Sequence, residues 1–151
     1  MSFFRHFSLY LGLAFPLAAS PVITEFLASN STGLTDQDGD TSDWIEIYNP
    51  TASSIDLTGW HLTDDTTNLT KWTFPTTTLL SGQHLLLFAS GKNRTTSGSE
   101  LHTNFSLSAN GEDLALTSPE LVISSEFNFP PQAGDISYGL TATGNQITLV
   151  S

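Results

Sequence analysis

The sequence predicts an all-β protein, a sandwich or barrel of antiparallel strands. After residue 20, no long stretch places apolar residues at the spacing of a helix, and short β-rich runs alternate instead with turn-forming clusters of Asp, Gly, Ser, Thr and Asn. Hydrophobic residues make up 38% of the 151 residues and aromatic residues 11%, which is enough for one hydrophobic core. Frequent Thr suits half-buried pleated surfaces.

Residues 1–20 have the pattern of a secretory signal peptide. A short segment with one Arg and one His precedes the apolar run Phe7–Leu17, and the small residues Ala18, Ala19 and Ser20 follow. The run is shorter than the roughly 20 apolar residues that cross a membrane. We therefore expect a secreted or periplasmic protein that is not inserted in a membrane after cleavage.

The remaining chain contains nine expected strands, each bounded by turn formers or proline. In chain order they are Val22–Ala28, Trp44–Tyr48, Ile55–Leu62, Lys71–Phe74, His84–Ala89, Phe105–Leu107, Asp113–Leu116, Leu121–Phe127 and Gln146–Val150. Alternation in the second strand puts Ile45 and Ile47 on one face and Glu46 on the other. Residues 141–151 are expected to be a C-terminal extension or an edge strand.

Three further local patterns carry expectations about the sheets. The continuous apolar run Leu85–Phe88 is typical of a central strand that is covered on both sides. Asn110-Gly111 predicts a tight hairpin, and Ser81-Gly82 predicts a turn.

Composition excludes several classes of function. The chain has 15 Asp and Glu against 4 Lys and Arg, for a net charge of -11, which disfavours binding to nucleic acid or to anionic lipid. It has no cysteine, which excludes disulfides, thiolate nucleophiles and zinc ribbons.

A set of segments taken in order resembles a known family. They are ITEFLASN at 23–30, DQDGDTSDWIEIYN at 36–49, DLTGWHLTD at 56–64, WTFP at 72–75, LHTNFSLS at 101–108 and SYG at 137–139. Together they are similar to the lamin-tail domain in its secreted bacterial form. The resemblance implies an immunoglobulin-like antiparallel β-sandwich over residues 21–140. It also implies a non-catalytic module.

The strongest candidate for a ligand site is an acidic loop ahead of the second strand. Asp36, Asp38, Asp40 and Asp43 fall within eight residues around Gly39, and Glu46 follows on the strand. Ca²⁺ takes six to eight oxygen ligands, which such a turn could supply, although the spacing is not that of an EF-hand. A solvated acidic turn is the competing interpretation, because Asp and Gly are common turn residues.

Other side chains have less specific interpretations. Trp44, Trp60 and Trp72 are expected to pack in the core, and an exposed aromatic platform for carbohydrate is the alternative. Glu25 and Glu46 either face solvent or are partly buried with a donor, Lys71 or a metal.

Enzyme motifs are absent from the sequence. There is no Gly-x-Ser-x-Gly, no His-Glu-x-x-His and no phosphate-binding loop, and none of the histidines lies in a recognisable motif. We therefore expect a secreted non-enzymatic module that binds a protein or a cell-surface polymer. The alternative is a calcium-dependent carbohydrate-binding accessory domain of a secreted hydrolase system, and a metal-assisted hydrolase is the weakest hypothesis.

Overall fold

The computed structural model describes residues 20–141 and 145–149, so the expected signal peptide lies almost entirely outside the described residues. The strands are β1 (Val22–Leu27), β2 (Asp43–Tyr48), β3 (Ile55–Asp56), β4 (His61–Thr63), β5 (Trp72–Thr73), β6 (Thr78–Leu79), β7 (His84–Ala89), β8 (Glu112–Thr117), β9 (Ile123–Phe129), β10 (Ser137–Leu140) and β11 (Gln146–Leu149). No helix in these two ranges is long and apolar enough to cross a membrane.

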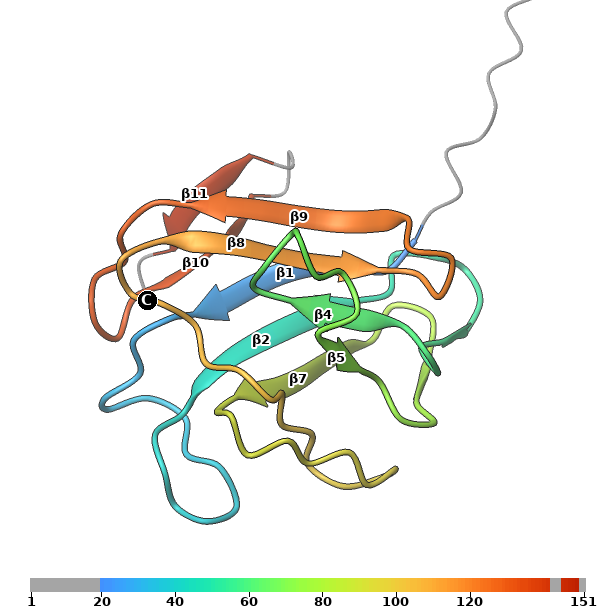
Figure 1. Cartoon of the computed structure of the whole chain (residues 1–151), viewed down its shortest axis with the longest axis horizontal. Coiled ribbons are helices and arrows are strands. Elements are labelled where there is room, and N and C mark those ends of the chain that lie inside the picture. The colour runs from blue at the N-terminus through green and yellow to red at the C-terminus, as the bar shows by residue number, and fades with distance from the viewer. Residues whose placement is uncertain (1–19, 142–144, 150–151) are drawn as a thin grey trace, which may run out of the picture.

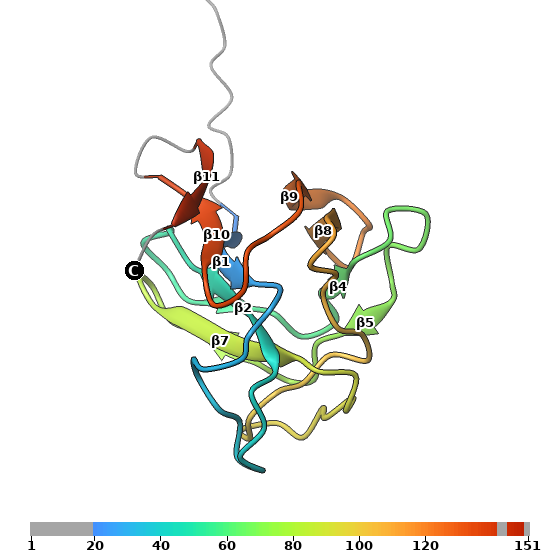
Figure 2. The same ribbon diagram turned by 90° about the vertical axis from the view of Figure 1, so that its left-hand side faces the viewer.

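Two antiparallel sheets face each other (Figure 1). One has the strand order β11-β10-β1-β2-β7 and the other β5-β4-β8-β9, while β3 and β6 pair separately. Figure 2 views the sheets from one end, with β10, β1, β2 and β7 on one side and β9, β8, β4 and β5 on the other. The prediction of an all-β, immunoglobulin-like sandwich is confirmed.

The core fills the space between the two sheets. Ile45 and Ile47 of β2 are fully buried, as their alternation with Glu46 predicts. Phe26 of β1 meets Phe127 of β9 edge to face, with ring centroids 5.3 Å apart. This aromatic contact joins the sheets directly, so the residues that build β1 and β9 also hold the two layers together.

The prediction of one continuous strand over Ile55–Leu62 is wrong. The segment is divided into β3 and β4, which belong to different sheets. Between them, the Trp60 amide donates to the Leu57 carbonyl, and Gly59 adopts a φ of +78°. Glycine tolerates this left-handed conformation, so the chain turns from one sheet to the other at that point.

The expectation that Leu85–Phe88 forms a central strand is also wrong. β7 lies at the edge of the five-stranded sheet, and Leu86 is 36% exposed. Phe88 is buried because an irregular segment covers it: its amide donates to Leu101 O, its carbonyl accepts from Thr103 N, and its ring stacks on His102. An irregular segment therefore lies along the edge of β7, where a central strand would have a neighbouring strand.

The chain between β7 and β8 is less regular than predicted. Phe105–Leu107 forms no strand, and only Ser106 bridges to Ser90. Asn110-Gly111 makes a turn but no hairpin, since the following β8 pairs with β4 and β9. The short strand β6 and the strand β10 were not predicted. β11 pairs with β10 and lies at the other edge of the five-stranded sheet.

Candidate functional site

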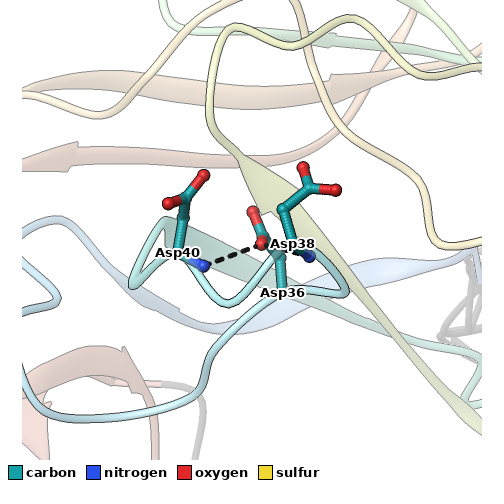
Figure 3. Close-up of side chains that lie close together, drawn as sticks. All are labelled: Asp36, Asp38 and Asp40. Atoms are coloured by element: carbon teal, nitrogen blue, oxygen red, sulfur yellow. Dashed lines mark hydrogen bonds between the residues drawn. The ribbon is translucent and has the colours of Figure 1, made fainter.

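The acidic loop between β1 and β2 is organised around the carboxylate of Asp36. Asp36 is 5% exposed, and its Oδ1 accepts the amides of Asp38 and Asp40 at 3.0 and 3.1 Å. Its own backbone closes the turn, because its amide donates to Asp40 O and its carbonyl accepts from Gly39 N. Figure 3 shows the three aspartate side chains rising from the same side of this turn.

Two basic side chains from a distant part of the sequence meet this loop. Lys92 Nζ lies 2.5, 2.7 and 2.8 Å from carboxylate oxygens of Asp36, Asp38 and Asp40. Arg94 Nη2 lies 2.5 Å from Asp38. Both cations belong to the segment after β7, which lies at the same end of the molecule as the acidic loop in Figures 1 and 2. The protein therefore supplies its own counter-charges to the loop.

The ion pairs change the pKa values of the groups that form them. Burial raises the pKa of Asp36, but hydrogen bonds from Lys92, the amides of Asp40 and Asp38, and Ser42 outweigh burial and hold the pKa well below its usual range. The hydrogen bonds from Lys92 to Asp36, Asp38 and Asp40 raise the pKa of the ammonium group. Asp36 and Lys92 therefore stay charged across the neutral pH range.

A second chain of hydrogen bonds connects the loop to the interior. Glu100 Oε1 accepts the amide of Gln37 at 2.9 Å and lies 2.9 Å from Nε2 of the fully buried His102. The other ring nitrogen of His102, Nδ1, is 2.8 Å from Ser90 Oγ. These contacts tie the acidic loop to the end of β7 and to the segment that covers Phe88.

The structure does not bring the five predicted metal ligands together. Asp36, Asp38 and Asp40 place carboxylate oxygens within 4.8 Å of one another. Asp43 instead accepts the Asn30 amide at the start of β2, and burial raises the pKa of this carboxyl group. Glu46 accepts the Thr24 hydroxyl group at 2.6 Å, and its Oε1 lies 2.9 Å from Nδ1 of His84.

Asp43 and Glu46 are separated because they are three residues apart on one strand. Side chains that differ by an odd number of positions project from opposite faces. Asp43 therefore shares the side of Ile45 and Ile47, whereas Glu46 lies on the outer face. Strand geometry prevents both from completing the shell of an ion held by the preceding loop.

Calcium at the loop stays a prediction. Three carboxylates that converge on one point could contribute oxygen ligands to a hard cation. The point where they converge is bounded by the ammonium group of Lys92, which would have to move away for an ion to enter. Bound Ca²⁺ and the Lys92 ion pairs are thus competing ways to neutralise the same charges.

Sequence reasoning missed the basic half of this site. Neither Lys92 nor Arg94 lies in a sequence motif that predicted a role at the acidic loop. One signal was present: the chain has only 4 Lys and Arg, and two of them lie within three residues, following a strand in a strongly acidic protein. Such a pair indicates a specific acidic partner, although it does not identify which carboxylates.

Two comparisons with known proteins bear on the chain as a whole. The family model described as Lamin Tail Domain matches residues 18–151. No curated protein matches the sequence. The family match includes the acidic loop, the segment after β7 and both sheets.

Proposed function

The chain belongs to the lamin-tail domain family, and we propose that it is a non-catalytic module that is exported and binds a protein or a cell-surface polymer. The observation that carries the proposal is the family match over nearly the whole chain, joined to an immunoglobulin-like sandwich. Such a sandwich presents sheet faces and loops as binding surfaces on a rigid core.

The arrangement of Ser90, His102 and Glu100 is consistent with a module without catalysis. Its contacts have the order of a serine–histidine–carboxylate set, with Ser90 and Glu100 at opposite ring nitrogens. The His102 ring is fully buried and stacked on Phe88, which supports a structural role for this residue. Its two hydrogen bonds satisfy a polar ring inside the fold.

A broad esterase and nuclease panel tests the absence of catalysis. We expect no turnover by the purified domain with or without divalent cations. Turnover that disappears in Ser90→Ala would contradict this part of the proposal.

Export rests on the pattern of the first 20 residues. We expect protein isolated from the extracytoplasmic fraction of its source cells to lack these residues, as intact-mass measurement will show. Exported protein that still begins at Met1 would contradict cleavage of this segment.

Binding is tested with the labelled domain, residues 21–151, on intact source cells. We expect saturable binding that the unlabelled domain displaces, because a specific module has a finite number of sites. Binding that rises linearly with concentration would contradict the proposal.

Carbohydrate is the second class of ligand to test. Trp44 and Trp60 are half-buried and Trp72 is buried, and the strongly exposed large apolar side chains of the described ranges are all Leu, Val or Ile. This distribution favours a protein partner over a flat aromatic platform for sugars. A glycan array with Ca²⁺ present separates the two classes.

A further inference from the structure

We propose that a groove on the outer face of the five-stranded sheet binds a lysine- or arginine-containing peptide segment of a partner protein. This inference rests on the proposed function as a binding module and specifies the chemistry of its partner. The groove has a volume of about 410 Å³ and lies where β1, β2 and β10 meet the loop after β1.

The walls of the groove combine apolar and acidic side chains. The groove is lined by the apolar side chains of Leu27, Leu34 and Trp44, of which Leu34 is 50% exposed. Glu25 and Asp135 contribute carboxylates to the same groove. This combination suits a side chain with an aliphatic stem and a cationic end, which is the chemistry of lysine and arginine.

The groove is held open by hydrogen bonds that exist without a ligand. Asp135 Oδ1 accepts the amides of Ser31 and Thr32 at 2.6 and 2.9 Å, and these amides belong to the loop that carries Leu34. Glu25 Oε1 accepts the hydroxyl group of Ser137. A site that is formed in advance spends less free energy on ordering when its partner binds.

The lysines and arginines of the described residues pair with other acidic groups. The described residues contain three basic side chains of Lys or Arg type, namely Lys71, Lys92 and Arg94. Lys71 pairs with Asp64, and the other two pair with the acidic loop. Within the described ranges, therefore, no lysine or arginine pairs with Glu25 or Asp135, and a basic partner would supply the missing charge.

Trp44 adds an aromatic side chain to the wall of the groove. Its indole is half-buried on the wall of the groove, so an arginine or lysine end could lie against an aromatic face.

The inference is tested by two-dimensional NMR titration of the ¹⁵N-labelled domain, residues 21–151. The probe is an N-acetylated, C-amidated peptide of alternating lysine and glycine, and the Trp44 indole signal is assigned from Trp44→Phe. We expect saturable shifts of that signal and of amides at Leu27, Leu34 and Ser137. A matched peptide with acetylated lysines should bind far more weakly.

Two pairs of variants distinguish binding in the groove from general attraction by the net negative charge. Glu25→Gln with Asp135→Asn keeps the hydrogen-bond acceptors, and asparagine tolerates the φ of +58° at Asp135. We expect this pair to weaken peptide binding about tenfold. Glu120→Gln with Glu126→Gln removes the same charge from exposed positions near and on β9 and should leave the affinity within about twofold of the unmodified domain.

Three results would overturn the inference. Equal weakening in both variant pairs would show attraction by net charge alone. Equal binding of the acetylated peptide would show that cations are not recognised. Shifts of the Trp44 signal with neutral chito-oligosaccharide but not with the lysine peptide would make the groove a sugar site.

The outcome is distinguishable from failure of the proposed function. If the groove variants keep saturable binding to source cells, the module binds elsewhere and only the groove assignment is wrong. If the unmodified domain shows no saturable cell binding, the proposed function itself is contradicted.

Discussion

At the scale of single residues, Asp36 and Lys92 organise the candidate site. Asp36 is enclosed by two amides, a serine hydroxyl group and the Lys92 ammonium group, so its charge is satisfied although the carboxylate is buried. Gly39 closes the turn with a φ of +85°, which favours glycine. The conformation of the loop therefore depends on the Asp36 carboxylate, and the buried carboxylate depends on the loop amides and Lys92 for its hydrogen bonds.

We predict that Asp36→Asn lowers the free energy of unfolding at pH 7 by about 1.5–3 kcal/mol, the range for a lost charged hydrogen bond. The pKa of Asp36 is depressed in the folded state, so its contribution is present above the unfolded pKa of about 3.9 and is lost as the pH falls through the folded pKa. Urea unfolding at pH 7, 4 and 3 should therefore show a shallower acid loss of stability in Asp36→Asn. Parallel pH profiles for the two proteins would be incompatible with this role.

Calcium and Lys92 should compete for the loop. We predict that millimolar Ca²⁺, relative to EDTA, raises the melting temperature of Lys92→Met more than that of the unmodified protein, because the competing ammonium group is gone. At a hundred times the dissociation constant, binding adds about 2.7 kcal/mol to the free energy of unfolding. Mg²⁺ should act more weakly, since it requires a tighter octahedron.

The calcium prediction has a clear negative outcome. If the curves in Ca²⁺ and EDTA superimpose for both proteins, the three aspartates form ion pairs and hydrogen bonds but no calcium site. Asp43→Asn is a matched control, because Asp43 lies outside the cluster of Asp36, Asp38 and Asp40.

At the scale of elements, tight turns decide which strands can pair. The turn before β8 places Gly111 against the end of β9. A Cβ at this position would lie 2.6 Å from Phe129 O and 2.9 Å from Pro130 C, and the φ is +90°. Both the close approach and the conformation therefore require glycine.

We predict that Gly111→Ala lowers the free energy of unfolding by about 2 kcal/mol or more, since left-handed strain is joined by a backbone clash. Gly82→Ala is the control. Gly82 has a φ of +69°, but a Cβ added there would have nothing within 4 Å, so about 1 kcal/mol of strain is expected. Equal losses in urea unfolding would show that the approach to β9 is unimportant.

At the scale of the whole molecule, the two sheets share one core. Phe26 contacts Phe127 and Phe129 of the opposite sheet and Tyr138 of its own. The loop after β7 covers the sheet edge and also carries Lys92 and Arg94, so packing and the acidic site depend on the same segment. Loss of the core should therefore unfold both sheets and the site together.

We predict that Phe26→Ala costs about 3–5 kcal/mol of stability, as for other large-to-small changes in a core. Unfolding followed by tryptophan fluorescence and by far-UV circular dichroism should remain one coincident transition. Leu86→Ala, on the exposed side of β7, should cost only about 0.5 kcal/mol. Separate transitions for the two probes would contradict a shared core.

Local patterns were sufficient for the fold class and for the approximate positions of most strands. Alternation of Ile45, Glu46 and Ile47 predicted the buried face of β2, and the spacing of turn formers predicted the all-β sandwich. The segments that resemble the lamin-tail domain predicted the family. These properties depend on neighbours in sequence, where side-chain period and turn chemistry act directly.

Tertiary structure alone decided the composition of the site. Lys92 is 56 residues from Asp36, and their contact depends on the packing of two irregular segments. The same packing covers the edge of β7, which the apolar run Leu85–Phe88 had suggested to be a central strand. A short-range pattern records which residues need burial or a counter-charge, but the fold selects the distant segment that supplies it, because that choice depends on the global arrangement of the sheets.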